Sequence, residues 1–284
     1  MSAGMERWRD WIGRETVAED RIGADRAQAL QATLDDPGPP LRPGDPLPPL
    51  WHWIYFWTVA PAATLGPDGH PERGGLLPPI ELPRRMWAGS RVTFLRALQV
   101  GAAATRRSRI TEVQFKEGRS GPLAFVTVRH EISAGGEACI EEEHDIVYRA
   151  APVPGEQPPP GEPAPTDAPW RREVTADPVL LFRYSALTFN GHRIHYDLKH
   201  ATGTEGYPGL VVHGPLLATL MLELLRAERP AARVTAFRFR AIGPIFDTAP
   251  FTLAGRPADG GKSAELWIAG PDGTYATRGS VDLA

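Results

Sequence analysis

Titratable side chains crowd into one stretch of the chain, residues 184–215, with the sequence YSALTFNGHRIHYDLKHATGTEGYPGLVVHGP. Three of the eight histidines, His192, His195 and His200, lie there within nine positions of one another. A neutral imidazole can take a proton from water near neutral pH, so the stretch could supply a general base. Metal binding by His195 with His192 or His200 is an alternative, as is a plain polar loop. Because no signature such as HExxH is present, we expect no metal.

The start of a helix follows these histidines directly. The segment VVHGPLLATLM, residues 211–221, places Gly214 and Pro215 where a helix begins. A glycine there leaves its backbone N–H open, and the partial positive charge of a helix N-terminus favours an oxygen that gains negative charge. A loop histidine opposite such a donor is the minimum machinery for adding water to an α,β-unsaturated thioester, or for removing it.

The elements that must position these residues occur twice along the chain in the same order, helix first and antiparallel strands after. In the first half we expect helices near 5–14 and 23–35 and strands at 91–100, 104–118, 122–135 and 137–149. In the second half a helix within 210–230 is apolar on most sides and therefore buried. Strands are expected after it at 233–246, 249–257, 263–273 and 274–283. One buried helix wrapped by an antiparallel sheet is the hotdog architecture, so we predict an α+β double hotdog.

Proline marks the boundary between the two units. Residues 151–170 hold eight prolines in twenty positions, which favours an extended linker. We therefore predict a first domain over 1–150, a linker over 151–174 and a second domain over 175–284. The Trp-rich segment WHWIYFW, residues 51–57, is expected in the core, with the wall of an acyl tunnel as its alternative.

Composition excludes several classes of protein. The net charge of −3 lacks the basic footprint of a nucleic-acid-binding protein. The single cysteine, Cys139, rules out an internal disulfide framework and any cysteine-cluster zinc site. No run of 18 apolar residues and no apolar signal core is present, so we expect no membrane partner and a cytoplasmic location. A monomer or a homodimer fits equally well.

The motif TFNGHRIHYD followed by GYPGLVVHGPLLATLM resembles the MaoC-like hydratase/dehydratase family, the hydratase 2 group of hotdog enzymes. The family pattern is roughly G-D-x-N-P-[LIV]-H-x-D, and IHYD matches its end. The resemblance implies that His195 is the catalytic histidine. The family's aspartate falls on Asn190, its asparagine on His192 and its proline on Arg193. Since an amide accepts no proton, we expect Asn190 to orient the water or the imidazole.

The stretches FNGHRIHYD, GRSGPLAFVTVRHE and FRAIGPIFDTAPF together resemble a subgroup containing mesaconyl-C4-CoA hydratase and 3-hydroxyacyl-thioester dehydratases. This implies a short, carboxylated acyl-CoA substrate, no cofactor, and a first half that lacks the catalytic motif. The predicted catalytic residues are His195, Asn190 and Gly214, the last as the oxyanion donor.

Four further residues are predicted to bind substrate, and four arginines are the nearest cations for its carboxylate. The first set is His192, Arg193, Tyr207 and His213, with a helix-start packing role as the alternative for His213. The second set is Arg183, Arg193, Arg238 and Arg240. Three other functions remain open: a 3-hydroxyacyl-ACP dehydratase, a hotdog thioesterase, and a non-catalytic acyl-CoA-binding subunit.

Overall fold

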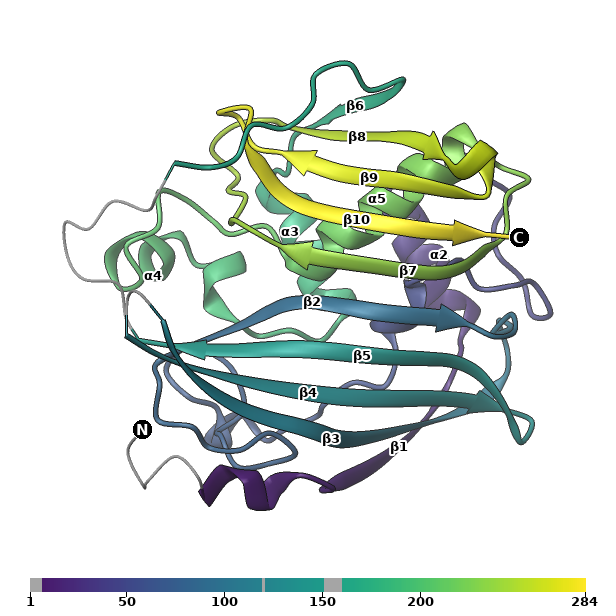
Figure 1. Cartoon of the computed structure of the whole chain (residues 1–284). Coiled ribbons are helices and arrows are strands. Elements are labelled where there is room, and N and C mark those ends of the chain that lie inside the picture. Colours follow the sequence, from purple (N-terminus) through teal and green to yellow (C-terminus); the bar gives the residue numbers. More distant parts are fainter. Residues whose placement is uncertain (1–6, 119–120, 151–159) are drawn as a thin grey trace.

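Two five-stranded antiparallel sheets join edge to edge into one ten-stranded sheet (Figure 1). The structure is a computed structural model that describes residues 7–118, 121–150 and 160–284. The strands of the first half are β1 (Glu15–Arg21), β2 (Arg84–Phe94), β3 (Ala103–Gly118), β4 (Gly121–Ala134) and β5 (Glu137–Arg149). Those of the second half are β6 (Trp170–Val174), β7 (Val234–Ala241), β8 (Phe251–Ala258), β9 (Ser263–Ala269) and β10 (Tyr275–Leu283).

The strand order is symmetric about the centre of the sheet. It runs β1-β3-β4-β5-β2-β7-β10-β9-β8-β6, and β2 pairs with β7 where the halves meet, with Val92 opposite Phe237. Because this pairing makes the sheet continuous, the two units share one scaffold. Of the predicted linker, residues 151–159 lie outside the described residues, while Trp170–Val174 form β6 and so belong to the second sheet.

The helices lie on one face of the sheet (Figure 1). They are α2 (Ala24–Thr33), α3 (Pro178–Leu187), α4 (Leu198–Gly203) and α5 (Gly214–Glu228), with 3-10 turns η1 (Arg7–Trp11), η2 (Trp51–Ile54), η3 (Ala62–Thr64), η4 (Arg193–His195) and η5 (Asp259–Gly261). Every residue of α5 from Leu216 to Leu225 is buried, as the apolar pattern predicts. The helix expected near 5–14 is wrong over the described residues 7–14, where the short η1 forms, and β1 begins at Glu15.

The two units are unequal, because the described part of the first half has no counterpart of α5. Its place beside the sheet is taken partly by the Trp-rich segment. Trp51, Ile54, Tyr55 and Phe56 are buried there, which confirms the predicted core position. The indole N–H of Trp51 donates to Glu223 of α5 at 2.9 Å, so this segment also joins the halves.

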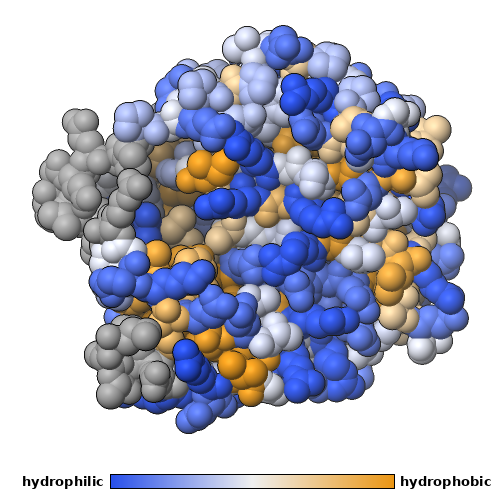
Figure 2. Space-filling view, viewed as in Figure 1, coloured by the Kyte–Doolittle hydropathy of each residue, from blue (hydrophilic) through white to orange (hydrophobic). Residues whose placement is uncertain are grey.

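The opposite face of the sheet is largely hydrophilic (Figure 2). On β7 the side chains alternate from Phe237 to Arg240, since Phe237 and Phe239 are buried while Arg238 and Arg240 are exposed. Arg238 pairs there with Asp282 at 2.9 Å. Among the described residues, no helix combines the length and the apolar character that crossing a membrane requires.

Candidate active site

The histidine-rich stretch forms a compact loop between α3 and α5. The side-chain oxygen of Asn190 accepts a hydrogen bond from the His192 backbone N–H at 3.0 Å, which shapes the turn after α3. Asp197 then caps α4 by accepting from the His200 N–H at 3.0 Å, and it pairs with Arg193 at 2.8 Å. Local hydrogen bonds of this kind are typical of Asn and Asp, and they hold the loop in one shape.

His195 lies at the centre of this loop and is 7% exposed. Its Nδ1 is 2.7 Å from the carbonyl oxygen of Val211. A carbonyl only accepts, so Nδ1 carries the proton and Nε2 keeps a free lone pair. Burial lowers the pKa of His195 to about 4, an effect that the bond to Val211 opposes only in part. The imidazole is therefore neutral near pH 7 and able to accept a proton.

His213 packs against one face of the His195 ring. The two rings stack with centroids 3.7 Å apart and planes at 18°. His213 is 1% exposed, is the N-cap residue of α5, and has its Nε2 2.8 Å from the hydroxyl of Ser185. This placement matches the packing role stated as the alternative for His213, while its substrate contact stays a prediction.

The stack brings His195 to the N-terminus of α5. Gly214, the first residue of the helix, follows His213 directly. A Cβ placed on Gly214 would meet nothing within 4 Å, so open space borders this backbone. Free N–H groups of the first turn and the helix dipole favour a negatively charged oxygen there. The geometry thus joins a proton acceptor with a site for developing negative charge.

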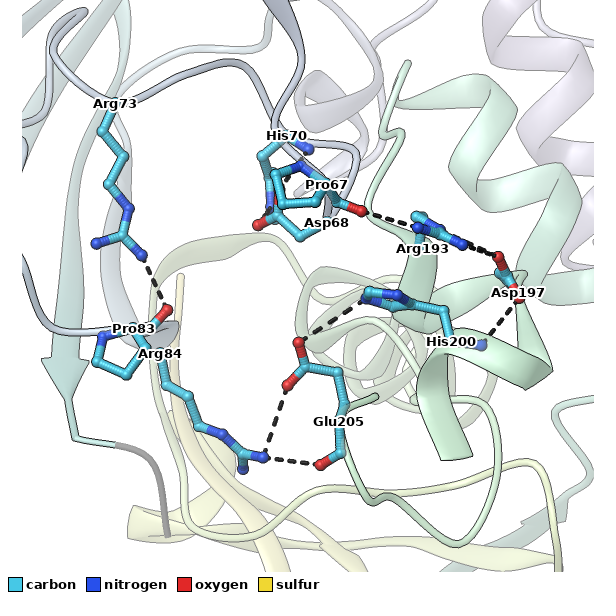
Figure 3. A network of polar contacts seen from close by, with 10 residues as sticks. All are labelled: Pro67, Asp68, His70, Arg73, Pro83, Arg84, Arg193, Asp197, His200 and Glu205. Atoms are coloured by element: carbon cyan, nitrogen blue, oxygen red, sulfur yellow. Dashed lines mark hydrogen bonds and ion pairs between the residues drawn. The ribbon is translucent and has the colours of Figure 1, made fainter. Parts of the chain in front are cut away.

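A loop from the first half, residues 64–72, lies against this motif (Figure 3). The backbone carbonyl of Asp68 accepts from the Arg193 N–H at 2.9 Å, and that of Pro67 accepts from the Arg193 guanidinium at 2.9 Å. Within the loop, the Asp68 carboxylate accepts from Nδ1 of His70 at 3.1 Å. Although partial burial raises the pKa of Asp68, the hydrogen bonds from His70 hold it below its usual range. The carboxylate is therefore ionised.

The loop brings a further imidazole to the site. The ring centroid of His70 lies 4.0 Å from that of His192, which in turn lies 5.4 Å from that of His195. Burial, with help from neighbouring His70 and His195, lowers the pKa of His192 to about 2. Asp68, His70 and His192 each offer one ligand atom within 4.8 Å of the others, and they are the residues that could hold a metal ion in the described part of the chain. The absence of a metal stays a prediction.

The remaining predicted residues differ in their burial and in their partners. Tyr207 is half-buried, and its ring centroid lies 5.7 Å from that of Phe246. The guanidinium carbon of Arg84 lies over the same ring, 5.1 Å from its centroid. Arg193 is held by Asp197 and Pro67, as described above. Arg183 is exposed on α3. The expectation that Arg238 or Arg240 serves the site is wrong, since both lie on the far face of the sheet.

Arg85 is a cation that sequence proximity did not single out. It lies half-buried on β2, in register with Tyr148 of β5, and its charge contributes to the low pKa of His192. No carboxylate partner for it occurs among the described residues. Neither Arg85 nor the Asp68–His70 pair could be linked to the motif from the sequence, because more than a hundred residues separate them.

Comparisons with known proteins extend this description. A family model for hydroxyacyl-thioester dehydratase type 2 matches residues 50–247. The mesaconyl-C(4)-CoA hydratase of Chloroflexus aurantiacus is 50% identical over 278 residues, which cover 97% of this chain and 98% of the relative. The mitochondrial hydroxyacyl-thioester dehydratase type 2 of Schizosaccharomyces pombe is 29% identical over 259 residues, which cover 78% of this chain and 80% of that protein.

Solved structures agree on the architecture. A MaoC-like dehydratase from Phytophthora capsici superposes with a TM-score of 0.69 at 14% identity, covering 97% of this chain and 98% of the other. A Mycobacterium tuberculosis protein described as a double hotdog superposes with a TM-score of 0.58 at 14% identity, covering 96% of each chain. Likenesses at such low identity concern the fold alone, and they confirm the predicted α+β double hotdog.

Proposed function

The chain belongs to the hydroxyacyl-thioester dehydratase type 2 family and is a hydro-lyase acting on CoA thioesters, and on that premise we propose that its substrate is a short acyl-CoA with a free carboxylate. The relative at 50% identity is a mesaconyl-C(4)-CoA hydratase, which supports a substrate of this class. The observation that carries the mechanism is the stack of His195 on His213, directly before the first N–H groups of α5.

In the hydration direction, Nε2 of His195 takes a proton from water as the hydroxyl adds to Cβ of the double bond. The displaced electron pair moves onto the thioester carbonyl oxygen, which the Gly214 N–H and the helix dipole stabilise. Cα then takes up a proton from solvent, and the imidazolium of His195 returns its proton to solvent, so that one water molecule is added overall. The side-chain oxygen of Asn190 is engaged by the His192 N–H, so its NH₂ group remains as the donor that orients the water.

A carboxylate on the substrate needs a cation close to the reacting carbons. In mesaconyl-C4-CoA the free carboxylate is attached to the carbon that receives the hydroxyl, so its binding group must lie near the attacking water. Arg85 fits this requirement best, because it is half-buried and its charge acts on His192. In this proposal His192 and Tyr207 line the acyl site beside it.

The aromatic segment of the first half favours a short acyl group. Trp57 stacks on Phe189 with ring centroids 5.1 Å apart, directly before Asn190. Trp53 packs on Trp87 at 4.9 Å and on Phe239 at 6.2 Å. These rings fill space beside the sheet in the first half, whose described part has no counterpart of α5. Because a long acyl chain would need this space, the rings favour a short one.

The test is turnover of three thioesters, followed at the ultraviolet band of the conjugated thioester. Mesaconyl-C4-CoA should be hydrated with the highest kcat/KM, crotonyl-CoA more slowly, and a long-chain enoyl thioester slowest. The variant Arg85→Gln should raise KM for the carboxylated substrate and leave crotonyl-CoA unchanged. Equal or better turnover of the long-chain thioester contradicts the proposed substrate class and supports a dehydratase of fatty-acid synthesis.

A further inference from the structure

Helix α3 ends in a turn in which glycine is the usual residue, and this sequence has phenylalanine there. The Asn190 N–H donates to the Ser185 carbonyl at 2.8 Å, and the next N–H back, that of Phe189, donates to the Ala186 carbonyl at 3.2 Å. These two bonds form a Schellman motif, in which the residue after the helix cap adopts the left-handed conformation and is usually glycine. Here that residue is Phe189, with a φ of +51°. A side chain in this conformation is strained, so a contact elsewhere must compensate for it.

Trp57, from the first half of the chain, supplies such a contact. Its ring stacks on that of Phe189 with centroids 5.1 Å apart and planes at 15°. Its indole N–H donates to the carbonyl oxygen of Leu187, the last residue of α3, at 2.9 Å. The last carbonyls of a helix have no partner within the helix, so this bond also completes the end of α3. Trp57 therefore contacts the turn through both its ring and its N–H.

The first half determines the position of Trp57. The same indole N–H lies 2.9 Å from the carbonyl oxygen of Ile54, a residue that is 1% exposed. The guanidinium carbon of Arg26 lies over the Trp57 ring, 4.9 Å from its centroid. Arg26 in turn pairs with Asp20 of β1 at 2.6 Å. These contacts place the indole independently of the turn on which it packs.

A second contact between the halves lies directly after Asn190. A Cβ on Gly69 would lie 2.0 Å from the carbonyl oxygen of Gly191, and a Cβ on Gly191 would lie 2.8 Å from the carbonyl oxygen of Gly69. Gly69 also has a φ of +86°, which disfavours other residues. Asn190 is therefore flanked by two residues that contact the first half, Phe189 before it and Gly191 after it.

Ser185 connects this turn to the catalytic histidine. Its carbonyl accepts from the Asn190 N–H, and its hydroxyl lies 2.8 Å from Nε2 of His213. The ring of His213 stacks on that of His195. Because these contacts fix the turn with respect to the stacked histidines, a displaced turn would move the Asn190 amide relative to the His195 imidazole.

From this arrangement we infer that Trp57 is a positioning residue for the proposed water addition, which holds Phe189 in its left-handed conformation and thereby sets the direction of the Asn190 amide. The inference rests on the proposed function, in which the NH₂ group of Asn190 orients the attacking water. Since Trp57 acts through Asn190, its loss should slow the chemical step and leave binding of the thioester largely unchanged. The half that lacks the catalytic motif thereby contributes to the geometry of the reaction.

The experiment measures kcat and KM of full-length variants on the thioester that wild type turns over fastest. Trp57→Leu should lower kcat by about 10- to 100-fold with KM changed less than about threefold, since a displacement of about 1 Å can lower a rate by about 100-fold. Phe189→Ala loses the stack and keeps the strained backbone, so its kcat should fall to a similar extent. Trp57→Phe keeps an aromatic ring and should lose less. Phe182→Ala is the matched control, because Phe182 is 63% exposed on the same helix and should be dispensable for the rate.

A double-variant comparison separates positioning from a general loss of structure. If Trp57 acts through Asn190, then Trp57→Leu should change kcat by less than about twofold in an Asn190→Ala background, because two residues that act as a unit are not additive. A structural role would lower kcat by the same factor in both backgrounds. Thermal unfolding of the same preparations shows that each variant is folded.

Two results overturn the inference. One is a folded Trp57→Leu or Phe189→Ala variant that keeps nearly the wild-type kcat. The other is a loss from Trp57→Leu that is as large in the Asn190→Ala background as in wild type. If Trp57→Leu does not fold, Phe189→Ala carries both comparisons, since Phe189 is 51% exposed. Failure of the proposed function is distinct, because wild type is then inactive on every thioester tested. An active wild type, a slow Asn190→Ala and a fast Trp57→Leu contradict this inference alone.

Discussion

Replacing Gly69 by alanine tests whether contact between the two loops is required for activity. The added Cβ lies 2.0 Å from the Gly191 carbonyl oxygen, whereas ordinary contact begins at 3.4 Å, so the loops must part by about 1.4 Å. A displacement of about 1 Å of a reacting group can lower a rate by about 100-fold. We therefore expect kcat to fall about 100-fold. The strained backbone adds a loss of about 1–3 kcal/mol in the free energy of unfolding.

Gly44→Ala is the matched control for this variant. Gly44 has a φ of +95°, close to that of Gly69, but a Cβ there meets nothing within 4 Å. Both variants should therefore lower Tm by several degrees through backbone strain, and only Gly69→Ala should lower kcat. The measurements are thermal unfolding and initial rates on the same preparations. Equal kcat in the two variants would refute the argument that contact between the loops positions a reacting group.

Three other predictions concern the buried polar groups. Because the pKa of His195 is about 4, kcat/KM for hydration should rise with pH through about 4 and be level near neutrality, and a pH–rate profile with its inflection near 6.5 would contradict this. Ser185→Ala removes the partner of buried His213 and should cost about 1–3 kcal/mol in urea unfolding, with a lower kcat; an unchanged midpoint would count against the stack as a support of the site. Glu142 is 3% exposed and accepts hydrogen bonds from His52 and Trp53, so Glu142→Leu should cost about 3–5 kcal/mol at pH 7. Although burial raises the pKa of Glu142, the neighbouring histidines lower it below its usual value. The contribution of Glu142 to the free energy of unfolding is therefore present above the pKa of the unfolded state, and it is lost as pH falls through the pKa of the folded state. The free energy of unfolding of the variant should accordingly decrease less on acidification than that of wild type.

Much of the fold followed from short-range patterns. Period-two alternation located the long strands β3, β4 and β5, and the apolar run after Gly214 located α5. The region before residue 22 was harder, because β1 is a largely exposed edge strand that forms by pairing with β3. Its sequence carries little apolar alternation, and the pairing is a long-range contact that a local pattern does not contain.

The candidate site also has one part that local sequence patterns predict and another part that they do not. His195 and Gly214 were predicted because they belong to one motif, and the structure brings that motif together at the start of α5. The Asp68–His70 pair could not be predicted, since it reaches the motif through the docking of two separate halves. Arg238 and Arg240 were near the motif in sequence, but strand alternation places them on the outer face. Proximity along the chain is therefore a poor guide to which cation serves the site.

Single-turnover hydration of mesaconyl-C4-CoA by wild type and His195→Ala, compared after both pass the same unfolding assay, tests the central role of His195 most directly. We predict that the variant binds the thioester but adds water at least about 10²-fold more slowly, since loss of a general base has this magnitude. A folded His195→Ala protein that hydrates the substrate at nearly the wild-type rate would contradict the account.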